Sequence, residues 1–327
     1  MVFTSSSVDD LVAAARLCED AGFESVWTTE FYDRSATISL AAMAMATERI
    51  ELGTAIAYAF GRTPLVLAAE ARDLDSLSGG RLLLGLGTGT QRMQRDWHGL
   101  DGEHPASRME ELVPLLRRLW HLHEGPIEHD GRFYRLHVRP TVPVAPPLRT
   151  DIPVYMAGVN ARMVQAAGTV ADGLVGHPLF TPEYVREVVR PALQRGAELA
   201  GRDRAVPIAG YINCAVSADG DAARRDAAAL IAFNSTVKTY QAIHQLHGFM
   251  DEVEAIRAAW KAGDWAGMAG AVTPEMVETI AIAGTPDEVR AQWTERWEGV
   301  YERPLLWPPA HRGLDGARAV IDALAGA

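Results

Sequence analysis

Apolar residues recur along the chain in two alternating patterns. Stretches with helical spacing, such as residues 8–21 and 36–48, alternate with short continuous apolar runs. Helical spacing predicts amphipathic helices, whereas short apolar runs bounded by turn residues predict buried strands. Read in this way, the chain contains eight strands, at residues 1–3, 25–29, 50–57, 81–86, 153–157, 173–176, 208–216 and 304–307.

Eight strands alternating with helices favour an α/β fold, a (β/α)8 TIM barrel that forms one domain over residues 1–327. Two stretches depart from the alternation. Residues 123–150 contain a hairpin signal at Asp130-Gly131 and a Pro-rich connector, and residues 221–298 are predicted to be mostly helical. We interpret both as insertions. A doubly wound sheet is the alternative, because strand counts made from sequence can be wrong by one or two.

The composition disfavours several classes of binding partner. The formal net charge of -11 disfavours binding to nucleic acid or to an anionic membrane surface, because both carry negative charge. No apolar run predicts a transmembrane helix, and the first residues lack the basic and apolar regions of a secretory signal. Cys18 and Cys214 are the only cysteines, too few for a disulfide framework or a zinc site. We therefore expect a cytoplasmic protein that binds a small molecule.

The sequence GRLLLGLGTGTQ, residues 80–91, combines a buried strand with closely spaced glycines. A dinucleotide-binding fingerprint has the spacing Gly-x-Gly-x-x-Gly at the first strand-to-helix turn. Gly85, Gly87 and Gly89 alternate with single residues on about the fourth strand, so they match that fingerprint poorly. The alternative is that bare backbone at the C-terminal end of a barrel strand lets a flat cofactor ring approach.

Four blocks carry a resemblance to a known family. They are GFESVWTTEFYD, ATERIELGTAIAYAFGRTPLVLAAEARDLDSLSGGRLLLGLGTG, VYMAGVNARMVQAAGTVADGLVGHP and AGTPDEVRAQW, which follow one another along nearly the whole chain. The chain resembles the luciferase-like oxidoreductases, and more narrowly the branch that uses the deazaflavin coenzyme F420. The resemblance implies a TIM barrel with the cofactor ring at the C-terminal ends of the strands, and an enzyme that transfers a hydride. FMN is the alternative cofactor.

The resemblance also assigns residues to the cofactor site. In the family, a bulge with a cis non-proline peptide bond on the third strand backs the ring, and the matching positions are Ala55 and Ile56. Backbone after the fifth strand holds the cofactor side chain near a helix N-terminus, where N–H groups attract phosphate. Asn160 is expected to cap that helix, and Arg162 to add positive charge. The expected cofactor-binding residues are Thr29, Ala55, Ile56, Gly87, Thr88, Ala157, Gly158, Val159, Asn160 and His177.

Glu30 is the candidate catalytic residue. It follows the second strand at a position that in the family often carries His or Glu, and a sheltered carboxylate there would act as an acid or base. The alternative is a solvated loop carboxylate. Thr90 stands where a sugar-phosphate dehydrogenase relative has a catalytic Glu, so Thr90 is either near the pocket or a helix cap, with Gln91 and Arg92 as further pocket candidates. His177 is either a cofactor contact or an ordinary loop histidine.

Other chemistries find little support in the sequence. No His, Asp or Glu cluster has metal-ligand spacing, and no Gly-x-Ser-x-Gly elbow is present. The stretch after the seventh strand is too long for a plain crossover, so Lys238, Tyr240 and His247 are candidates for a lid. Trp260 and Trp265 are expected in the core or at a subunit contact, and the resemblance implies a homodimer. An FMN-dependent monooxygenase and a non-catalytic flavin or deazaflavin binder are the alternative functions.

Overall fold

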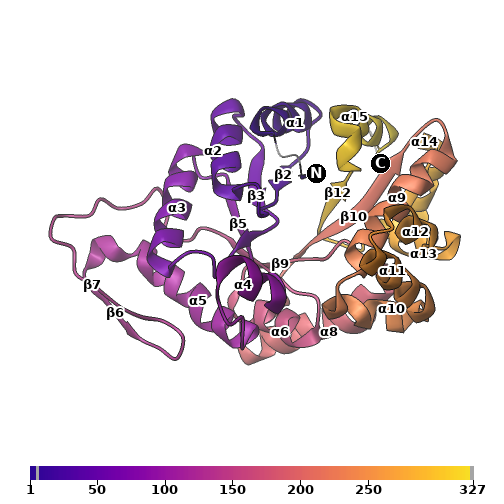
Figure 1. Ribbon diagram of the computed structural model, residues 1–327. Helices are drawn as coiled ribbons and strands as arrows, with labels where there is room; N and C mark the ends of the chain where they lie inside the picture. The colour runs from indigo at the N-terminus through magenta and orange to yellow at the C-terminus, as the bar shows by residue number, and fades with distance from the viewer. Residues whose placement is uncertain (5–6, 325–327) are drawn as a thin grey trace.

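Ten strands form one curled parallel sheet in the computed structural model of the chain, which describes residues 1–4 and 7–324 (Figure 1). The strands are β1 (Val2–Phe3), β2 (Ser25–Thr28), β3 (Glu51–Thr54), β4 (Ala57–Tyr58), β5 (Leu82–Gly87), β8 (Val154–Ala157), β9 (Gly173–Val175), β10 (Ile208–Val216), β11 (Ala281–Gly284) and β12 (Arg303–Trp307). Their hydrogen-bonded order is β1-β2-β3-β5-β8-β9-β10-β11, with β4 beside β5 and β12 beside β10.

Helices connect the strands and cover the outer face of the sheet (Figure 1). They are α1 (Val8–Asp20), α2 (Ala36–Ala46), α3 (Pro64–Leu77), α4 (Gln91–His98), α5 (Pro105–Trp120), α6 (Ala161–Val170), α7 (Pro182–Tyr184), α8 (Arg190–Leu199), α9 (Gly220–Ser235), α10 (Gln241–His247), α11 (Met250–Ala262), α12 (Trp265–Gly270), α13 (Pro274–Ile280), α14 (Pro286–Gln292) and α15 (Gly313–Leu324). Two π-helical turns, Val185–Val189 and Trp293–Trp297, extend α7 and α14. The last helix, α15, packs on α1, which brings the two ends of the chain to the same side.

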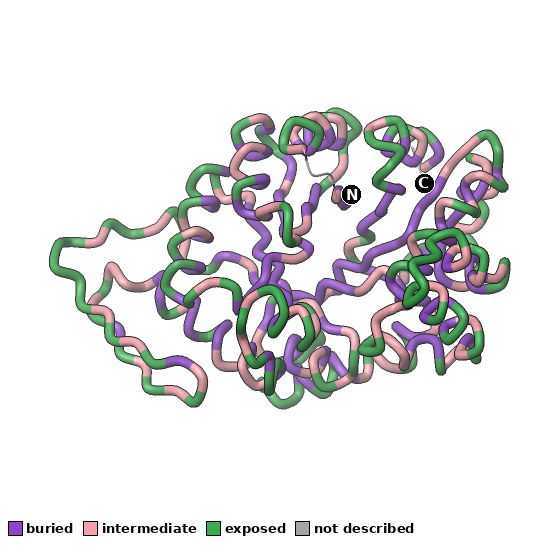
Figure 2. Tube along the Cα trace, in the orientation of Figure 1, coloured by how far each residue is buried: buried purple, intermediate pink, exposed green. Residues whose placement is uncertain are grey.

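Side chains from around the sheet fill its inside. One cluster joins Val2 of β1 and Leu305 of β12 with Trp27, Tyr155 and Tyr211 from the strands between them. The rings of Trp27 and Tyr155 meet edge to face, with 5.6 Å between their centroids. Because residues from both ends of the sheet share this cluster, the sheet curls back on itself as the strands of TIM barrels do. Figure 2 shows the result, with buried strand backbone at the centre and exposed backbone on the outer helices.

The predicted third strand is interrupted where the site is formed. It was expected at residues 50–57, but β3 ends at Thr54 and β4 begins at Ala57. The peptide bond between Ala55 and Ile56 is cis, as the resemblance implied. β4 pairs with the end of β5, so the sheet continues beyond this break.

The stretch expected to be mostly helical, residues 221–298, contains an additional strand. β11 lies between α13 and α14 and pairs in parallel with Asn213–Val216 of β10. Only Ile282 in this strand is β-branched, and its alanines favour helix, so local propensity concealed it and pairing with β10 decided it. The predicted hairpin is present as an antiparallel pair, β6 (Ile127–Asp130) and β7 (Arg135–Val138).

Three smaller expectations concern the termini, the cysteines and the membrane. Residues 325–327 of the predicted last helix lie outside the described residues. Cys18 and Cys214 are both buried and unbridged. Burial raises the pKa of the Cys18 thiol to about 11 and that of Cys214 to about 12, so both stay protonated near neutral pH. None of the described helices is both long and apolar enough to cross a membrane.

Candidate active site

A cavity of about 1170 Å³ opens at the C-terminal edge of the curled sheet. Residues that follow β2, β3, β5, β8 and β9 line it, because the ends of parallel strands converge at that edge. The structure brings together in this wall every residue expected at the site: Thr29, Glu30, Ala55, Ile56, Gly87, Thr88, Ala157, Gly158, Val159, Asn160 and His177. Their individual roles remain predictions.

The three glycines of the β5 stretch meet three packing needs. A Cβ on Gly85 would lie 1.7 Å from the carbonyl oxygen of Thr54. The N–H of Gly85 donates to the Thr54 hydroxyl at 2.9 Å, and that hydroxyl donates to the Gly85 carbonyl at 2.6 Å. A Cβ on Gly87 would lie 2.7 Å from Cγ1 of Ile56, and Gly89 turns the chain with a φ of 64°. Gly85 and Gly87 therefore allow the third strand and β5 to approach closely, and Gly89 allows the turn that follows β5.

Three hydrogen bonds hold the Ala55–Ile56 segment in the cavity wall. The N–H of Ala55 donates to the carbonyl of Thr28 at 2.7 Å, and the hydroxyl of Tyr211 donates to the carbonyl of Ala55. The N–H of Glu30 donates to the carbonyl of Ile56 at 2.9 Å. Ala55 is buried and Ile56 half-buried, so this part of the wall presents backbone and small apolar groups to the cavity.

The carboxylate of Glu30 is engaged on both oxygens. Its Oε2 accepts hydrogen bonds from the N–H of Tyr58 at 2.7 Å and from Nη1 of Arg62 at 2.8 Å, and its Oε1 accepts from Nη2 of Arg62 at 2.6 Å. The Glu30 side chain is 9% exposed, which contradicts a solvated loop carboxylate. Arg62 also pairs through Nε with Oε2 of Glu70 at 2.7 Å. Both oxygens of the Glu30 carboxylate therefore already accept hydrogen bonds from within the chain.

Arg62 is the residue that sequence reasoning missed at this site. Its only signal is the position of an arginine within AFGRTP, directly after an apolar strand and before the first turn of α3. Hydrogen bonding to Glu30 raises the pKa of the Arg62 guanidinium, so Arg62 stays positively charged.

The first turns of α5 and α6 form another part of the cavity wall, with Ser107 and Arg162 in the lining. Among the described residues, no side chain caps either helix. His104 precedes α5 with a left-handed φ of 50°, and the side-chain amide of Asn160 donates to the carbonyl of Thr239 at 3.3 Å. Asn160 therefore holds the N-cap position of α6, as predicted, but its side chain makes no capping hydrogen bond. Uncapped N–H groups and the helix dipole favour an anion at this end of the cavity.

Arg162 adds positive charge beside these helix ends. Its guanidinium donates to the Glu110 carboxylate at 2.8 and 2.6 Å, and to the Ser107 hydroxyl at 3.4 Å. Hydrogen bonding to Glu110 raises the pKa of Arg162. The side chain of Arg162 is 51% exposed, so the ion pair is loose enough for the guanidinium to be shared with a ligand.

His177 lies against the insertion that follows β10. Its ring centroid is 3.8 Å from that of Tyr240, which also lines the cavity, and its Nδ1 accepts a hydrogen bond from the N–H of Leu179 at 3.2 Å. Burial, followed by the nearby His244, lowers the pKa of His177 to about 3. His177 is therefore a neutral polar group at physiological pH.

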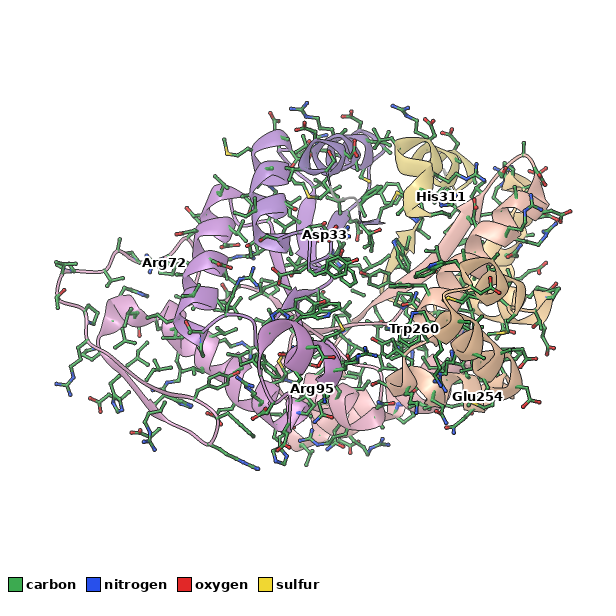
Figure 3. All side chains as sticks on the ribbon, viewed as in Figure 1. Asp33, Arg72, Arg95, Glu254, Trp260 and His311 are labelled. Carbon is green, nitrogen blue, oxygen red and sulfur yellow. The ribbon has the colours of Figure 1, made fainter. Side chains whose placement is uncertain are left out.

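The contacts around α4 show where the pocket candidates Thr90, Gln91 and Arg92 lie. The hydroxyl of Thr90 accepts from the N–H of Met93 at 3.2 Å and caps α4, so the helix-cap interpretation is confirmed. Gln91 lines the cavity with it. The guanidinium of Arg92 instead lies 6.0 Å from the ring centroid of Trp260 on α11. Figure 3 shows Trp260 on the side of the insertion that faces α4.

Four described residues of the insertion line the cavity, Leu230, Phe233, Thr239 and Tyr240, whereas the other lid candidates, Lys238 and His247, do not. Lys238 is exposed, and Nε2 of His247 shares a hydrogen bond of 2.8 Å with a threonine hydroxyl that follows β9. Trp260 and Trp265 are 40% and 67% exposed, so their expected place in the core is wrong. In the described residues, no group of three or more His, Cys, Asp or Glu side chains is arranged to hold a metal ion.

Comparisons with known proteins agree with this architecture. The family model described as luciferase-like monooxygenase matches residues 2–302. The uncharacterised protein Rv1360 of Mycobacterium tuberculosis is 34% identical over 302 residues, which cover 89% of this chain and 88% of that protein. The structure of the coenzyme F420 dependent tetrahydromethanopterin reductase from Methanopyrus kandleri matches with a TM-score of 0.84 and 26% identity, over 100% of this chain and 96% of that one.

A more distant structure carries a different cofactor. The oxygenating constituent of 3,6-diketocamphane monooxygenase from Pseudomonas putida, in complex with FMN, matches with a TM-score of 0.68 and 17% identity. The match covers 98% of this chain and 91% of that chain. At this identity the likeness shows a shared fold, which serves both deazaflavin and flavin proteins.

Proposed function

Because the chain belongs to the luciferase-like monooxygenase family, we propose that it is an oxidoreductase that uses coenzyme F420 to transfer a hydride to or from a small organic substrate. One observation carries the proposal. A single cavity combines a wall of backbone and apolar side chains, at Ala55–Ile56 and Gly87, with uncapped helix ends that favour an anion. A flat ring with a phosphate-bearing side chain needs both surfaces.

The residues present fit such a cofactor. The Cβ that Gly87 lacks would collide with Ile56, so glycine at this position lets the Ile56 segment lie close against β5 in the wall. In the proposal, Thr29, Ala55, Ile56, Gly87 and Thr88 hold the ring. The side chain lies along the backbone that enters α6, beside the neutral His177; the residues concerned are Ala157, Gly158, Val159 and Asn160. When bound, the deazaflavin supplies a hydride at its C5 carbon, and the chain binds, orients and shields it.

The remaining cavity surface suits an organic substrate. The volume of about 1170 Å³ lies above the usual range for one drug-sized ligand, so it has room for a cofactor and a substrate together. Phe31, Tyr58, Phe233 and Trp307 contribute aromatic surface to the lining. Burial raises the pKa of the Tyr58 phenol, so Tyr58 is a neutral group there.

Titration of the purified protein with F420 and with FMN, followed by fluorescence quenching, tests the cofactor. We expect saturable, stoichiometric binding of F420 that is at least about tenfold tighter than binding of FMN. Hydride transfer is then followed by bleaching of the bound F420 with alcohols, or by its reoxidation with enones and carbonyl compounds. Binding of neither cofactor contradicts the proposal.

An FMN-dependent monooxygenase is the second candidate, favoured by the shared fold with the FMN-bound Pseudomonas putida protein. It predicts preference for FMN in the titration and oxygen consumption by the reduced holoprotein. Stoichiometric binding of either cofactor, without turnover of any substrate in either assay, identifies a non-catalytic binder instead.

A homodimer is also part of the proposal, because α2 and α3 pack against each other and both expose apolar side chains. Ile38 and Met45 on α2 are 65% and 73% exposed, and Leu65 and Val66 on α3 are 42% and 48% exposed. Such a patch favours burial against another surface. In sedimentation, Met45→Glu is expected to convert a dimer to monomer, whereas the same change at the exposed Leu199 on α8 is the control. A monomeric wild-type protein contradicts the dimer.

A further inference from the structure

We propose that Arg62 is a positioning residue, which acts through Glu30 to hold the Ala55–Tyr58 segment in the shape that receives the cofactor ring. The inference rests on the proposed function. Arg62 is not among the described lining residues of the cavity, so it does not act by contact with a ligand. Glu30 in turn acts as a clamp, with no part in proton transfer.

Glu30 binds the segment at two points. Its N–H donates to the carbonyl of Ile56 at 2.9 Å, and its carboxylate accepts from the N–H of Tyr58 at 2.7 Å. These bonds lie on either side of Ala57, so they fix the backbone where the chain resumes as β4. Ile56 and Tyr58 both line the cavity, and a shift of this backbone changes the surface that a ring meets.

Arg62 fixes the direction of the Glu30 carboxylate. The two side chains form a bidentate pair, at 2.8 and 2.6 Å, with 15% and 9% of their side-chain surfaces exposed. A bidentate guanidinium–carboxylate pair is directional as well as strong, and lysine does not reproduce it. The Nε of the same guanidinium pairs with Oε2 of Glu70 at 2.7 Å. The carboxylate of Glu30 is therefore aimed at the Tyr58 N–H by Arg62.

The structure also contains a matched pair that is unrelated to the cavity. Arg149 donates from Nε and Nη2 to Asp75, at distances of 3.0 and 2.6 Å to Oδ1, and Asp75 is 1% exposed. This pair lies near the start of β5, at the edge of the sheet opposite the cavity, since Arg149 also donates to the carbonyl of Leu82. Arg149→Lys therefore disrupts a comparable buried pair without touching the cavity wall.

The first measurement uses the protein without cofactor. Hydrogen exchange is followed by mass spectrometry in peptides that contain Tyr58, for the wild type, Arg62→Lys and Arg149→Lys. We expect exchange at the Tyr58 amide to accelerate about tenfold in Arg62→Lys and to stay unchanged in Arg149→Lys. Equal exchange in all three proteins overturns the clamp.

The second measurement is the F420 and FMN titration with the same proteins. For the cofactor that the wild type binds, Arg62→Lys is expected to raise Kd about tenfold, and Arg149→Lys to change it less than twofold at a similar loss of Tm. An equal loss in both variants means general destabilisation and overturns the inference, as does a wild-type Kd in Arg62→Lys. If the wild type binds neither cofactor, the proposed function fails and the inference fails with it.

Glu30→Gln separates positioning from proton transfer. The amide oxygen still accepts from Tyr58, but the charge pair with Arg62 is lost, so we expect the same rise in Kd as in Arg62→Lys. The pH profile of turnover is expected to keep its shape, because in this proposal the carboxylate that is removed only positions the backbone and transfers no proton. Unchanged cofactor binding together with loss of one limb of that profile assigns Glu30 to proton transfer and overturns the inference.

Discussion

Two walls of the cavity differ in how their polar groups are satisfied. In the wall from β2 to β4, the N–H and carbonyl of Ala55, the carbonyl of Ile56 and the carboxylate of Glu30 have partners within the chain. In the wall formed by α5 and α6, no described side chain caps either helix. By contrast α1, α2, α3 and α4 are capped by Ser7, Ser35, Thr63 and Thr90.

The difference indicates which part of the site exists before a ligand arrives. A wall whose polar groups form hydrogen bonds with other groups of the chain keeps its shape without a ligand. A flat ring needs such a fixed surface. Helix ends without caps leave N–H groups for a ligand or water, so they gain most when an anion binds. The first wall therefore determines shape, and the second supplies affinity.

The largest effect on stability is expected from a substitution at Gly85, in the first wall. A Cβ there would lie 1.7 Å from the backbone oxygen of Thr54, and two packed strands have no room to separate. We expect Gly85→Ala to cost more than about 3 kcal/mol of unfolding free energy, measured by denaturant titration. Gly61→Ala is the control, since its Cβ would meet nothing closer than 3.5 Å. A soluble Gly85→Ala protein with wild-type stability contradicts the close approach.

Acidification tests the packing of the insertion around the buried His244 on α10. Neither ring nitrogen of the buried His244 has a hydrogen-bond partner in the described part of the chain, and burial, more than Arg257 and His247, lowers its pKa to about 4. The unfolded chain takes up this proton below pH ~6.5, whereas the folded chain does not until pH ~4, so stability falls as pH falls through that window. We expect His244→Leu to remove on the order of 2 kcal/mol of the loss measured at pH 4.

The control for that measurement is the same substitution at His137, an exposed histidine of the hairpin. His137→Leu is expected to leave the pH dependence of Tm unchanged. An identical slope in the wild type and His244→Leu contradicts this prediction and means that His244 has a hydrogen-bond partner in solution.

Adding a side-chain cap to α6 tests whether the wall formed by α5 and α6 binds the anion. In Asn160→Asp, the carboxylate can accept from the first-turn N–H groups, so we expect a gain of about 0.5 to 1 kcal/mol in stability. The same negative charge repels a phosphate, so Kd for the cofactor is expected to rise about tenfold, and less at high salt. Glu110→Gln, which releases Arg162 from its partner, is expected to act in the opposite direction on Kd. Equal cofactor binding in both variants means that the α6 terminus does not hold the anion.

The smallest effect is expected at Thr90. Its hydroxyl caps α4, so Thr90→Ala should cost about 1 kcal/mol, while Thr90→Ser should cost less than half of that. Both variants are expected to turn over substrate at close to the wild-type rate. Loss of turnover in both variants at unchanged Tm would give Thr90 a role in the reaction beyond capping.

The agreement between sequence and structure is uneven, and particular residues show why. Strand periodicity and turn residues located most of the sheet, and motif resemblance located Ala55 and Ile56, because these signals are local. β11 was missed because its Ala-rich residues favour helix locally and become a strand only through pairing with β10. The pairing of Glu30 was not predicted because its partner, Arg62, is 32 positions away and is brought to it only by folding.

The sequence by itself determined the alternation of strands and helices, the glycines that permit close strand contact, and the set of residues that gather at the C-terminal edge of the sheet. Only the tertiary structure decided how the polar groups of that edge are paired. It engages the carboxylate of Glu30, turns the Asn160 amide away from α6 and leaves the ends of α5 and α6 uncapped. The physical reason is that apolar periodicity follows from backbone geometry along the chain, whereas a hydrogen bond depends on distances of about 3 Å between groups that the sequence keeps far apart.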